Sequence, residues 1–271
     1  MEVLTTRRFE FSAAHRYWNP SWSPERNLEV FGKCTNEHGH GHNYVLEVTV
    51  AGEVDPDTGM VINLVDLKAI VGRVLEGFDH KHLNEDTPHF RDRQPTTENI
   101  VSVLWELIFG ALPAVVRLAH LRLYETPDVF ADYGGGPGAA FGRGYRFAAA
   151  HRLHSPALSP EENVATFGKC NNPAGHGHDY RFEVTVAGPV DAETGMVVNL
   201  ADLDAAVAPL LEELDHTHLD RQQAHFAERP STGENIVVYL WERLAAATGE
   251  RLGWVRLWET PNNVFDYGGG A

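Results

Sequence analysis

Three histidines in the first half of the chain have the types and spacing of a metal site. His40 and His42 are two residues apart in an alternating segment, so both imidazoles face the same side of a strand. His15, at the end of an earlier strand-like segment, supplies a third nitrogen. Three histidine ligands leave one coordination position of Zn²⁺ open for water or substrate, as in catalytic zinc sites. The sequence therefore predicts a zinc site formed by His15, His40 and His42.

The second half of the chain repeats this set. His151, His176 and His178 follow the first three histidines at an offset of 136 residues. An isolated His-x-His pair is weak evidence for a metal site, but a third histidine in both copies argues against a chance pattern. Two zinc sites are expected.

One cysteine accompanies each set of histidines, Cys34 in the first copy and Cys170 in the second. A free cysteine is commonly a buried apolar side chain. Alternatively it is a fourth ligand that closes a structural site, or a thiolate that acts as base or nucleophile beside the metal. The polar, turn-like sequence around each cysteine argues against burial. Spacing alone leaves the other two interpretations open.

An Asp-His pair follows the first expected helix of each copy, as Asp79-His80 and as Asp215-His216. A carboxylate that orients an imidazole forms a general acid/base pair near neutral pH. The alternative is a cationic histidine at a helix C-terminus, which the helix dipole favours. Taken without the other motifs, the pair is better explained by the helix terminus.

Glutamates at two positions of each copy are candidates for substrate binding. Glu125 and Glu259 lie near the end of a strand-like segment, before Thr-Pro. A fixed carboxylate accepts two parallel N–H bonds from a planar, guanidine-like edge, which a pterin ring presents. Glu98 and Glu234 could support that contact, although a helix-capping role explains them equally well.

The chain is a duplication of one domain-sized unit. Phe31-Gly-Lys-Cys-Thr-Asn36 recurs as Phe167-Gly-Lys-Cys-Asn-Asn172, and near the end of each copy the offset falls from 136 to 134 residues. A Gly- and Pro-rich stretch after Tyr133 is typical of a linker. We predict one unit over residues 1–137 and a second over residues 138–271.

Within each unit the patterns predict strand, strand, helix, helix, strand, strand. In the first copy the strands are expected at residues 6–14, 40–50, 116–126 and 129–133, and the helices begin near residues 63 and 96. This order favours an α+β class, with two helices on one face of a four-stranded antiparallel sheet. The open sheet edges indicate a homo-oligomer.

Composition narrows the classes of function. Of the 271 residues, 43% are hydrophobic and 22% charged, as in soluble globular proteins. The net charge of −16 argues against general nucleic-acid binding. We expect no membrane partner and a cytoplasmic location, since no secretory signal or apolar run of spanning length is present. Two cysteines do not indicate a disulfide framework.

The combined motifs resemble the 6-pyruvoyl-tetrahydropterin synthase/6-carboxytetrahydropterin synthase family over nearly the whole chain, twice. The first copy carries Cys34-Thr-Asn-Glu-His-Gly-His40-Gly-His42-Asn-Tyr44, Asp79-His80-Lys81, Pro95-Thr96-Thr97-Glu98-Asn99 and Leu123-Tyr-Glu125-Thr126. The second carries Cys170-Asn-Asn-Pro-Ala-Gly-His176-Gly-His178-Asp-Tyr180, Asp215-His216, Ser231-Thr232-Gly233-Glu234-Asn235 and Leu257-Trp-Glu259-Thr260.

The resemblance implies a tunnelling fold whose units form trimeric barrels that stack face to face, so that a tandem chain supplies two units to one ring or one to each of two. It implies the six histidines as zinc ligands and Cys34 and Cys170 as the proton-abstracting bases. The Asp-His pairs would assist proton transfer across a subunit interface. The implied pterin-binding residues are Glu125, Glu259, Glu98, Glu234, Thr96 and Thr232.

The implied reaction is conversion of 7,8-dihydroneopterin triphosphate to 6-pyruvoyl-tetrahydropterin with loss of triphosphate, a lyase reaction. One rival is 6-carboxytetrahydropterin synthase, which uses the same substrate and also releases acetaldehyde, on the route to deazapurine nucleosides. Five residues separate Cys34 from His40, as in the pyruvoyl type. A second rival is a non-catalytic zinc- or pterin-binding assembly. Candidate triphosphate-binding cations are Arg16, Arg152, Lys33 and Lys169.

Overall fold

The computed structural model describes residues 2–269, and the two copies repeat the same order of elements. The first copy comprises β1 Glu2–His15, α1 Pro24–Phe31, β2 His40–Glu53, α2 Leu64–Leu75, β3 Lys81–His82, α3 Leu83–Asp86, α4 Thr97–Ala111, β4 Arg117–Thr126 and β5 Val129–Tyr133. The second comprises β6 Gly138–His151, α5 Pro160–Phe167, β7 His176–Pro189, α6 Leu200–Leu214, β8 Thr217–His218, α7 Leu219–Gln222, α8 Gly233–Thr248, β9 Leu252–Thr260 and β10 Asn263–Tyr267. Short 3₁₀ turns follow α1 and α5, and each carries the cysteine of its copy.

The sheet of the first unit has the order β5-β4-β2-β1-β3. Its four long strands pair antiparallel, as predicted, while the two-residue β3 adds a parallel pairing to β1 that the sequence did not indicate. The register places His15 opposite His40 and Ala13 opposite His42. The two strands therefore bring all three histidines to one end of the sheet.

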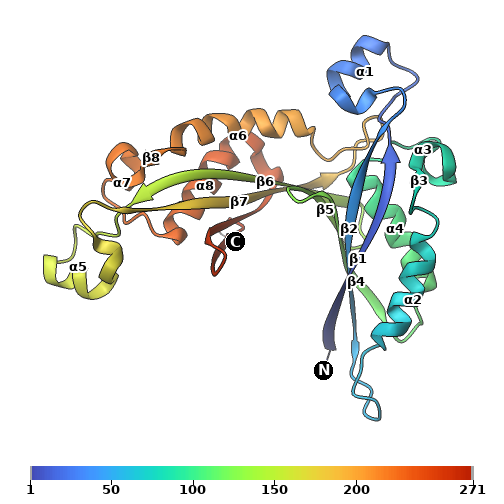
Figure 1. Cartoon of the computed structure of the whole chain (residues 1–271), viewed down its shortest axis with the longest axis horizontal. Coiled ribbons are helices and arrows are strands. Elements are labelled where there is room, and N and C mark those ends of the chain that lie inside the picture. The colour runs from blue at the N-terminus through green and yellow to red at the C-terminus, as the bar shows by residue number, and fades with distance from the viewer. Residues whose placement is uncertain (1, 270–271) are drawn as a thin grey trace. The chain divides into compact units, whose positions relative to one another are not determined.

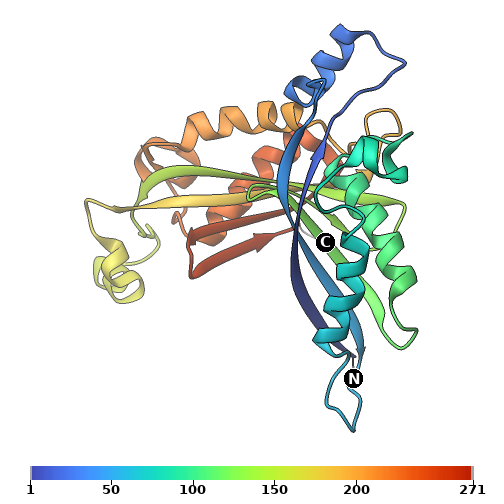
Figure 2. The same ribbon diagram turned by 45° about the vertical axis from the view of Figure 1, so that its right-hand side comes forward.

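Two helices cover one face of this sheet, α2 and α4 (Figure 1). Along β2 the side chains of Tyr44, Leu46 and Val48 are buried while the intervening residues are only partly covered, because the pleat turns alternate residues toward the helices. Figure 2 shows both helices running along the same side of β1 and β2. The histidines of β2 continue this alternation and lie on the helix-covered face.

Polar caps fix where both helices begin. The Asn63 side chain accepts from the Val65 amide at the start of α2, and the Thr96 hydroxyl accepts from the Asn99 amide at the start of α4. The predicted start of a helix near residue 96 is therefore confirmed. The cap sets the first turn of α4 beside the histidine end of the sheet.

The second unit repeats this architecture, with the strand order β10-β9-β7-β6 and β8 paired to β6. By backbone contacts, one compact unit comprises Met1–Gly142 with Ala187–Asn199, and the other comprises Arg143–Val186 with Leu200–Ala271. Residues 187–199, which comprise the end of β7 and the turn after it, thus pack with the first copy. The predicted boundary near residue 138 stays a prediction, and residues 1, 270 and 271 lie outside the described part.

Both copies contain helices and strands in the predicted α+β arrangement. Across residues 2–269, none of the helices has the length and apolar character needed to cross a bilayer.

Candidate metal and pterin site

The three histidines of the first copy converge. One ring nitrogen from each of His15, His40 and His42 lies within 4.8 Å of the other two. The Nε2 atoms of His15 and His40 are 3.1 Å apart, and His42 Nε2 is buried without a hydrogen bond among the described residues. A buried ring nitrogen without a partner is costly unless something else satisfies it. This nitrogen set fits a metal ion.

Contacts on the far side of the His15 ring hold it in place. His15 is fully buried, and its Nδ1 lies 2.9 Å from the Pro95 carbonyl oxygen and 3.2 Å from the Tyr44 hydroxyl. A hydrogen bond from Nδ1–H to a carbonyl leaves Nε2 as the lone-pair nitrogen, the usual arrangement behind a metal-bound histidine. Burial lowers the pKa of His15 to about 4, which keeps the imidazole neutral as a ligand must be.

The second copy reproduces this geometry. His151, His176 and His178 form an equivalent group, with 3.1 Å between the first two Nε2 atoms. His151 Nδ1 lies 2.8 Å from the Ser231 carbonyl oxygen, although serine replaces proline at that position. A backbone carbonyl serves equally well from either residue.

Neither cysteine is among the converging ligand atoms. Within the described chain the two metal-capable groups contain histidines alone. Cys34 is partly buried, and its pKa is raised to about 11 by burial and by the Glu125 carboxylate. The position of the thiol therefore argues against a closed Cys-His₃ shell and against a core cysteine. The third interpretation, a reactive thiol, stays a prediction.

In each copy an arginine side chain donates a hydrogen bond to the loop that carries the cysteine. Arg16 Nε donates to the Thr35 carbonyl at 3.0 Å, and its guanidinium lies over the Trp18 ring. Arg152 makes the same contact with the Asn171 carbonyl. These predicted phosphate-binding arginines thus position the loops that carry the cysteines, whereas Lys33 and Lys169 are exposed.

Glu125 lies beside the metal-capable group. Its Oε1 is 3.5 Å from His42 Nε2, and its Oε2 accepts hydrogen bonds from Thr97 at 2.7 Å and from Tyr17 at 3.5 Å. The glutamate side chain is only 13% exposed. In the second copy Glu259 Oε1 is 3.9 Å from His178 Nε2. A carboxylate fixed in this way can bind a planar N–H edge while the rest of the ligand reaches the histidines.

Thr96 and Glu98, also predicted to bind substrate, are buried at the start of α4. The Glu98 carboxylate accepts from the Val197 amide at 2.9 Å, and Thr96 donates to the Gly195 carbonyl at 2.5 Å. Burial raises the pKa of Glu98 to about 7. Their counterparts are more open, since Glu234 is exposed and Thr232 only partly covered.

The raised pKa of Glu98 predicts a pH-dependent stability. From pH 4.5 to 7 the folded carboxyl holds a proton that the unfolded one has released, so stability falls as pH rises through this window, by about 3 kcal/mol. Glu98→Gln removes the titrating group. Denaturant unfolding at pH 5 and pH 8 measures the effect. The free energy of unfolding of wild type should fall by about this amount between the two pH values, relative to that of Glu98→Gln. Glu234→Gln is the control for the same change at an exposed position, and parallel pH profiles for wild type and Glu98→Gln would contradict the expectation.

The Asp-His pairs form in both copies, and in the second copy His216 and His178 line the same hollow of about 400 Å³. His80 Nδ1 is 2.9 Å from Asp79 Oδ2, and the His80 ring is 82% exposed. No hydrogen bond or ion pair joins this pair to the metal-capable group within residues 2–269. His216 repeats the geometry with Asp215 at 2.8 Å, and His80 and His216 have φ values of 56° and 58°. Such strained backbone concentrates at functional positions, but a left-handed residue is also common just after a helix. The Asp79 and Asp215 amides close helical turns on the Leu75 and Leu211 carbonyls, so each histidine follows a helix end and the helix-terminus alternative stays open.

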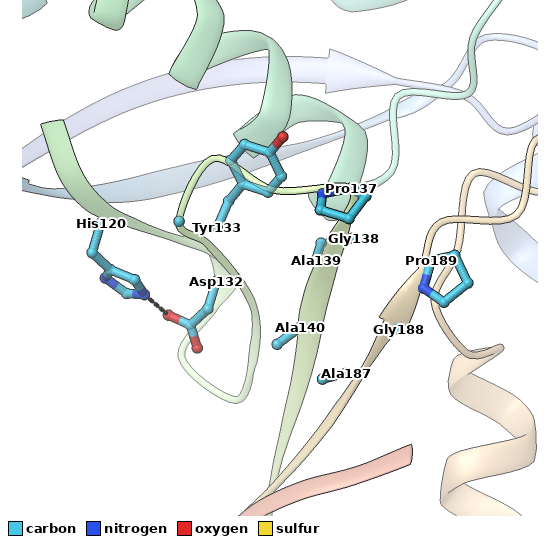
Figure 3. Close-up of a pocket in the computed structure, with 11 residues that line it drawn as sticks. His120, Asp132, Tyr133, Pro137, Gly138, Ala139, Ala140, Ala187, Gly188 and Pro189 are labelled. Atoms are coloured by element: carbon cyan, nitrogen blue, oxygen red, sulfur yellow. Dashed lines mark ion pairs between the residues drawn. The ribbon is translucent and has the colours of Figure 1, made fainter. Parts of the chain in front are cut away.

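A separate hollow in the first unit is not part of this site. It measures about 560 Å³, and His120 and Asp132 face each other on its wall with 3.0 Å between Nε2 and Oδ1 (Figure 3). None of the predicted site residues lines it. In the second copy Trp254 replaces His120 and donates to Asp266. The feature preserved in both copies is the three-histidine group.

Several contributing residues were not predicted. Tyr17 and Thr97 orient Glu125, and Tyr44 and the Pro95 carbonyl contact His15. The repetition of Tyr44 as Tyr180 was a usable signal. Pro95 acts through its backbone carbonyl, which leaves no signal in the pattern of side chains.

Fold and site together define a duplicated α+β protein with a metal-capable three-histidine group and an adjacent fixed carboxylate in each copy. A family model described as 6-pyruvoyl tetrahydropterin synthase matches residues 4–136 and again residues 142–270. The chain belongs to this family. The predicted duplication and tunnelling-fold class are thereby confirmed.

Relatives match one copy at a time. A 6-pyruvoyl tetrahydrobiopterin synthase of Drosophila melanogaster is 48% identical over 136 residues, which span 49% of this chain and 81% of that protein. The Homo sapiens protein of the same name is 46% identical over 135 residues, 49% of this chain and 92% of that protein. A dihydroneopterin monophosphate aldolase of Pyrococcus furiosus is 35% identical over 125 residues, 46% of this chain and 91% of that protein. The solved 6-pyruvoyl tetrahydropterin synthase of Caenorhabditis elegans is 43% identical, with a TM-score of 0.48, and the match covers 49% of this chain and 97% of that one.

Proposed function

We propose that the chain is a lyase that converts 7,8-dihydroneopterin triphosphate to 6-pyruvoyl-tetrahydropterin with release of triphosphate. The observation that carries the proposal is the fixed carboxylate of Glu125 beside three converging histidines, in a chain of which about half is 46–48% identical to proteins named for this product. The repeated group in the second copy supports the same activity there.

We propose Zn²⁺ as the metal of both sites, held by His15, His40 and His42 and by their counterparts. The close ring nitrogens and the buried His42 Nε2, which has no hydrogen bond in the described chain, fit a small cation with nitrogen ligands. When bound, the ion would polarise side-chain hydroxyl or carbonyl oxygens of the substrate and stabilise negative charge on them.

Glu125 would fix the pterin ring through two N–H bonds, with Thr97 and Tyr17 holding the carboxylate in orientation. Because Glu125 also lies 3.5 Å from His42, a ring bound there would place its side chain at the histidines. Glu98 and Thr96 would line the ring pocket from the start of α4.

Cys34 would take a C–H proton from the substrate side chain, and an Asp-His pair would return one elsewhere. The ring gains the electrons that the side chain loses, so no redox cofactor is required. Within the described chain Asp79 and His80 have no hydrogen bond or ion pair to the histidines of their own copy. We infer, as the family resemblance implies, that the pair that serves a given site comes from a neighbouring unit. Triphosphate leaves as the anion.

The 6-carboxytetrahydropterin synthase reaction is the second candidate, because it needs the same groups. The spacing of five residues between Cys34 and His40 favours the pyruvoyl product. The aldolase among the relatives means that family membership alone does not fix the reaction.

Incubation of the zinc-loaded protein with 7,8-dihydroneopterin triphosphate, followed by mass analysis, tests the proposal. The expected products are 6-pyruvoyl-tetrahydropterin and triphosphate. Acetaldehyde with 6-carboxytetrahydropterin would establish the second candidate instead, and unchanged substrate would refute both.

A further inference from the structure

The two copies hold the carboxylate of the candidate pterin anchor in different ways. In the first copy the hydroxyls of Thr97 and Tyr17 both donate to Glu125 Oε2. These two residues are only 2% and 7% exposed, and the Tyr17 ring also packs against His15, with 5.0 Å between the ring centroids. The first carboxylate is therefore oriented from the buried side of the site before any ligand binds.

Neither hydroxyl is present in the second copy. Leu153 and Gly233 stand at the two corresponding positions, and neither residue has a side chain that can donate a hydrogen bond. Glu259 Oε2 instead accepts from the side-chain amide of Asn263 at 3.0 Å, in an exposed contact for which water competes. The second carboxylate is therefore held less firmly than the first.

An aromatic ring occupies the place of the missing threonine side chain. A Cβ on Gly233 would lie 2.1 Å from Cε2 of Phe265, so no side chain fits on this glycine while the ring is there. Phe265 is itself the counterpart of the buried Ala131. The strand register is the same in both copies, so both side chains point to the helix-covered face. The second copy has thus exchanged a threonine and an alanine for a glycine and a phenylalanine.

This exchange changes the chemistry next to the anchor. The first site has a hydroxyl 2.7 Å from its carboxylate, whereas the second has a phenyl ring in the same place. The polar edge of a ligand loses its hydration on entering either site, and a phenyl ring offers no hydrogen bond in return. A carboxylate that is not oriented in advance also loses rotational freedom when the ligand binds. Both effects weaken the binding of a polar ring at the second site.

We propose that the two sites of the chain differ in their affinity for pterins, that the first site is the tight one, and that the pair Gly233 and Phe265 sets the difference. The inference rests on the proposed function for the class of ligand, and on the side chains of the two copies for the difference between them.

A difference in affinity has a consequence for the activity of the whole chain. Both copies retain the three-histidine group, so the same reaction proceeds at both. The second site fills with substrate only at a higher concentration than the first. The rate therefore continues to respond to substrate over a wider range of concentration than it would with two equal sites.

Calorimetric titration of the zinc-loaded, full-length chain with neopterin tests the proposal, because neopterin carries the pterin N–H edge but no phosphate that could be eliminated. Two binding steps are expected, with dissociation constants about tenfold or more apart. Glu125→Gln should remove the tight step, and Glu259→Gln should remove the weak one. Two equal sites, or loss of the tight step in Glu259→Gln, would overturn the proposal and leave the proposed function intact. Absence of neopterin binding at both sites would overturn both.

Exchange of the side chains provides a second test. Gly233→Thr together with Phe265→Ala should strengthen the weak step, since removal of the ring makes room for a hydroxyl beside Glu259. Thr97→Val together with Tyr17→Phe removes both hydroxyls of the first copy with little change of shape, and it should weaken the tight step about tenfold. Bound zinc, measured on the same samples, should be unchanged, because the histidine ligands are intact.

Tyr133→Phe is the matched control for the loss of a hydroxyl. Tyr133 donates to the Gly136 carbonyl, outside the site, so this variant should bind neopterin as wild type does. If both exchanged proteins kept the two binding steps of wild type, these side chains would not set the difference between the sites.

Discussion

Replacing both Cys34 and Cys170 with alanine is expected to lower the turnover number by roughly 10²–10⁴-fold, the usual effect of losing a general base. Fold and bound zinc should be unchanged, because the converging ligand atoms in the described chain are histidine nitrogens alone. Burial and Glu125 raise the pKa of Cys34 to about 11 in the metal-free protein. A cation on the nearby histidines would favour the thiolate and oppose that shift.

The duplication supplies the controls for this experiment. Cys34→Ala and Cys170→Ala singly should each remove the activity of one copy, so that the residual rates of the two variants sum to the wild-type rate. Metal content by mass spectrometry and thermal unfolding should match wild type in all three variants. Loss of zinc or of folded structure on removal of either thiol would instead assign the cysteines a structural role, as the non-catalytic alternative requires.

The residues that the sequence predicted best are those whose position depends on local periodicity. The alternation from His40 to Val50 determines which side chains face the helices, and the pairing of His15 with His40 follows from two strands that end together. The cap at Thr96 is likewise a local signal. In each case the interaction involves a few neighbouring residues or one pair of strands. The second copy repeats the same pattern, which strengthened the prediction.

Contacts between segments far apart in sequence could not be predicted in this way. The orientation of Glu125 depends on hydrogen bonds from Tyr17 and Thr97. The three residues lie in three separate segments of the chain. The burial of Glu98 depends on Val197, 99 residues away. The sequence offered capping or substrate binding as explanations for Glu98 and Glu234 alike, whereas the structure gives them different surroundings. Similar motifs need not have the same environment, because the covering segment lies outside the motif.

Loss of one zinc ligand per copy is expected to have a similarly large effect, on the amount of bound zinc. His42→Ala should reduce bound zinc from two equivalents per chain to one, and His42→Ala with His178→Ala should reduce it to none, since each group has three ligands. Two imidazoles hold Zn²⁺ far less tightly than three, and a metal that binds only the folded protein adds to its stability. Zinc content after dialysis against a weak chelator measures the first effect, and the thermal midpoint with and without zinc measures the second.

His38→Ala is the matched control for the first copy. His38 lies two residues before His40 and is an extra candidate ligand by sequence, but it is exposed and does not belong to the converging group. This variant should keep two equivalents of zinc and the wild-type rate. If His42→Ala retained both equivalents, or if His38→Ala lost one, the metal would have to be held by a different set of residues. In that case the position of Glu125 beside His42 would no longer place the pterin side chain at the metal, and the proposed lyase chemistry would lose its geometric basis.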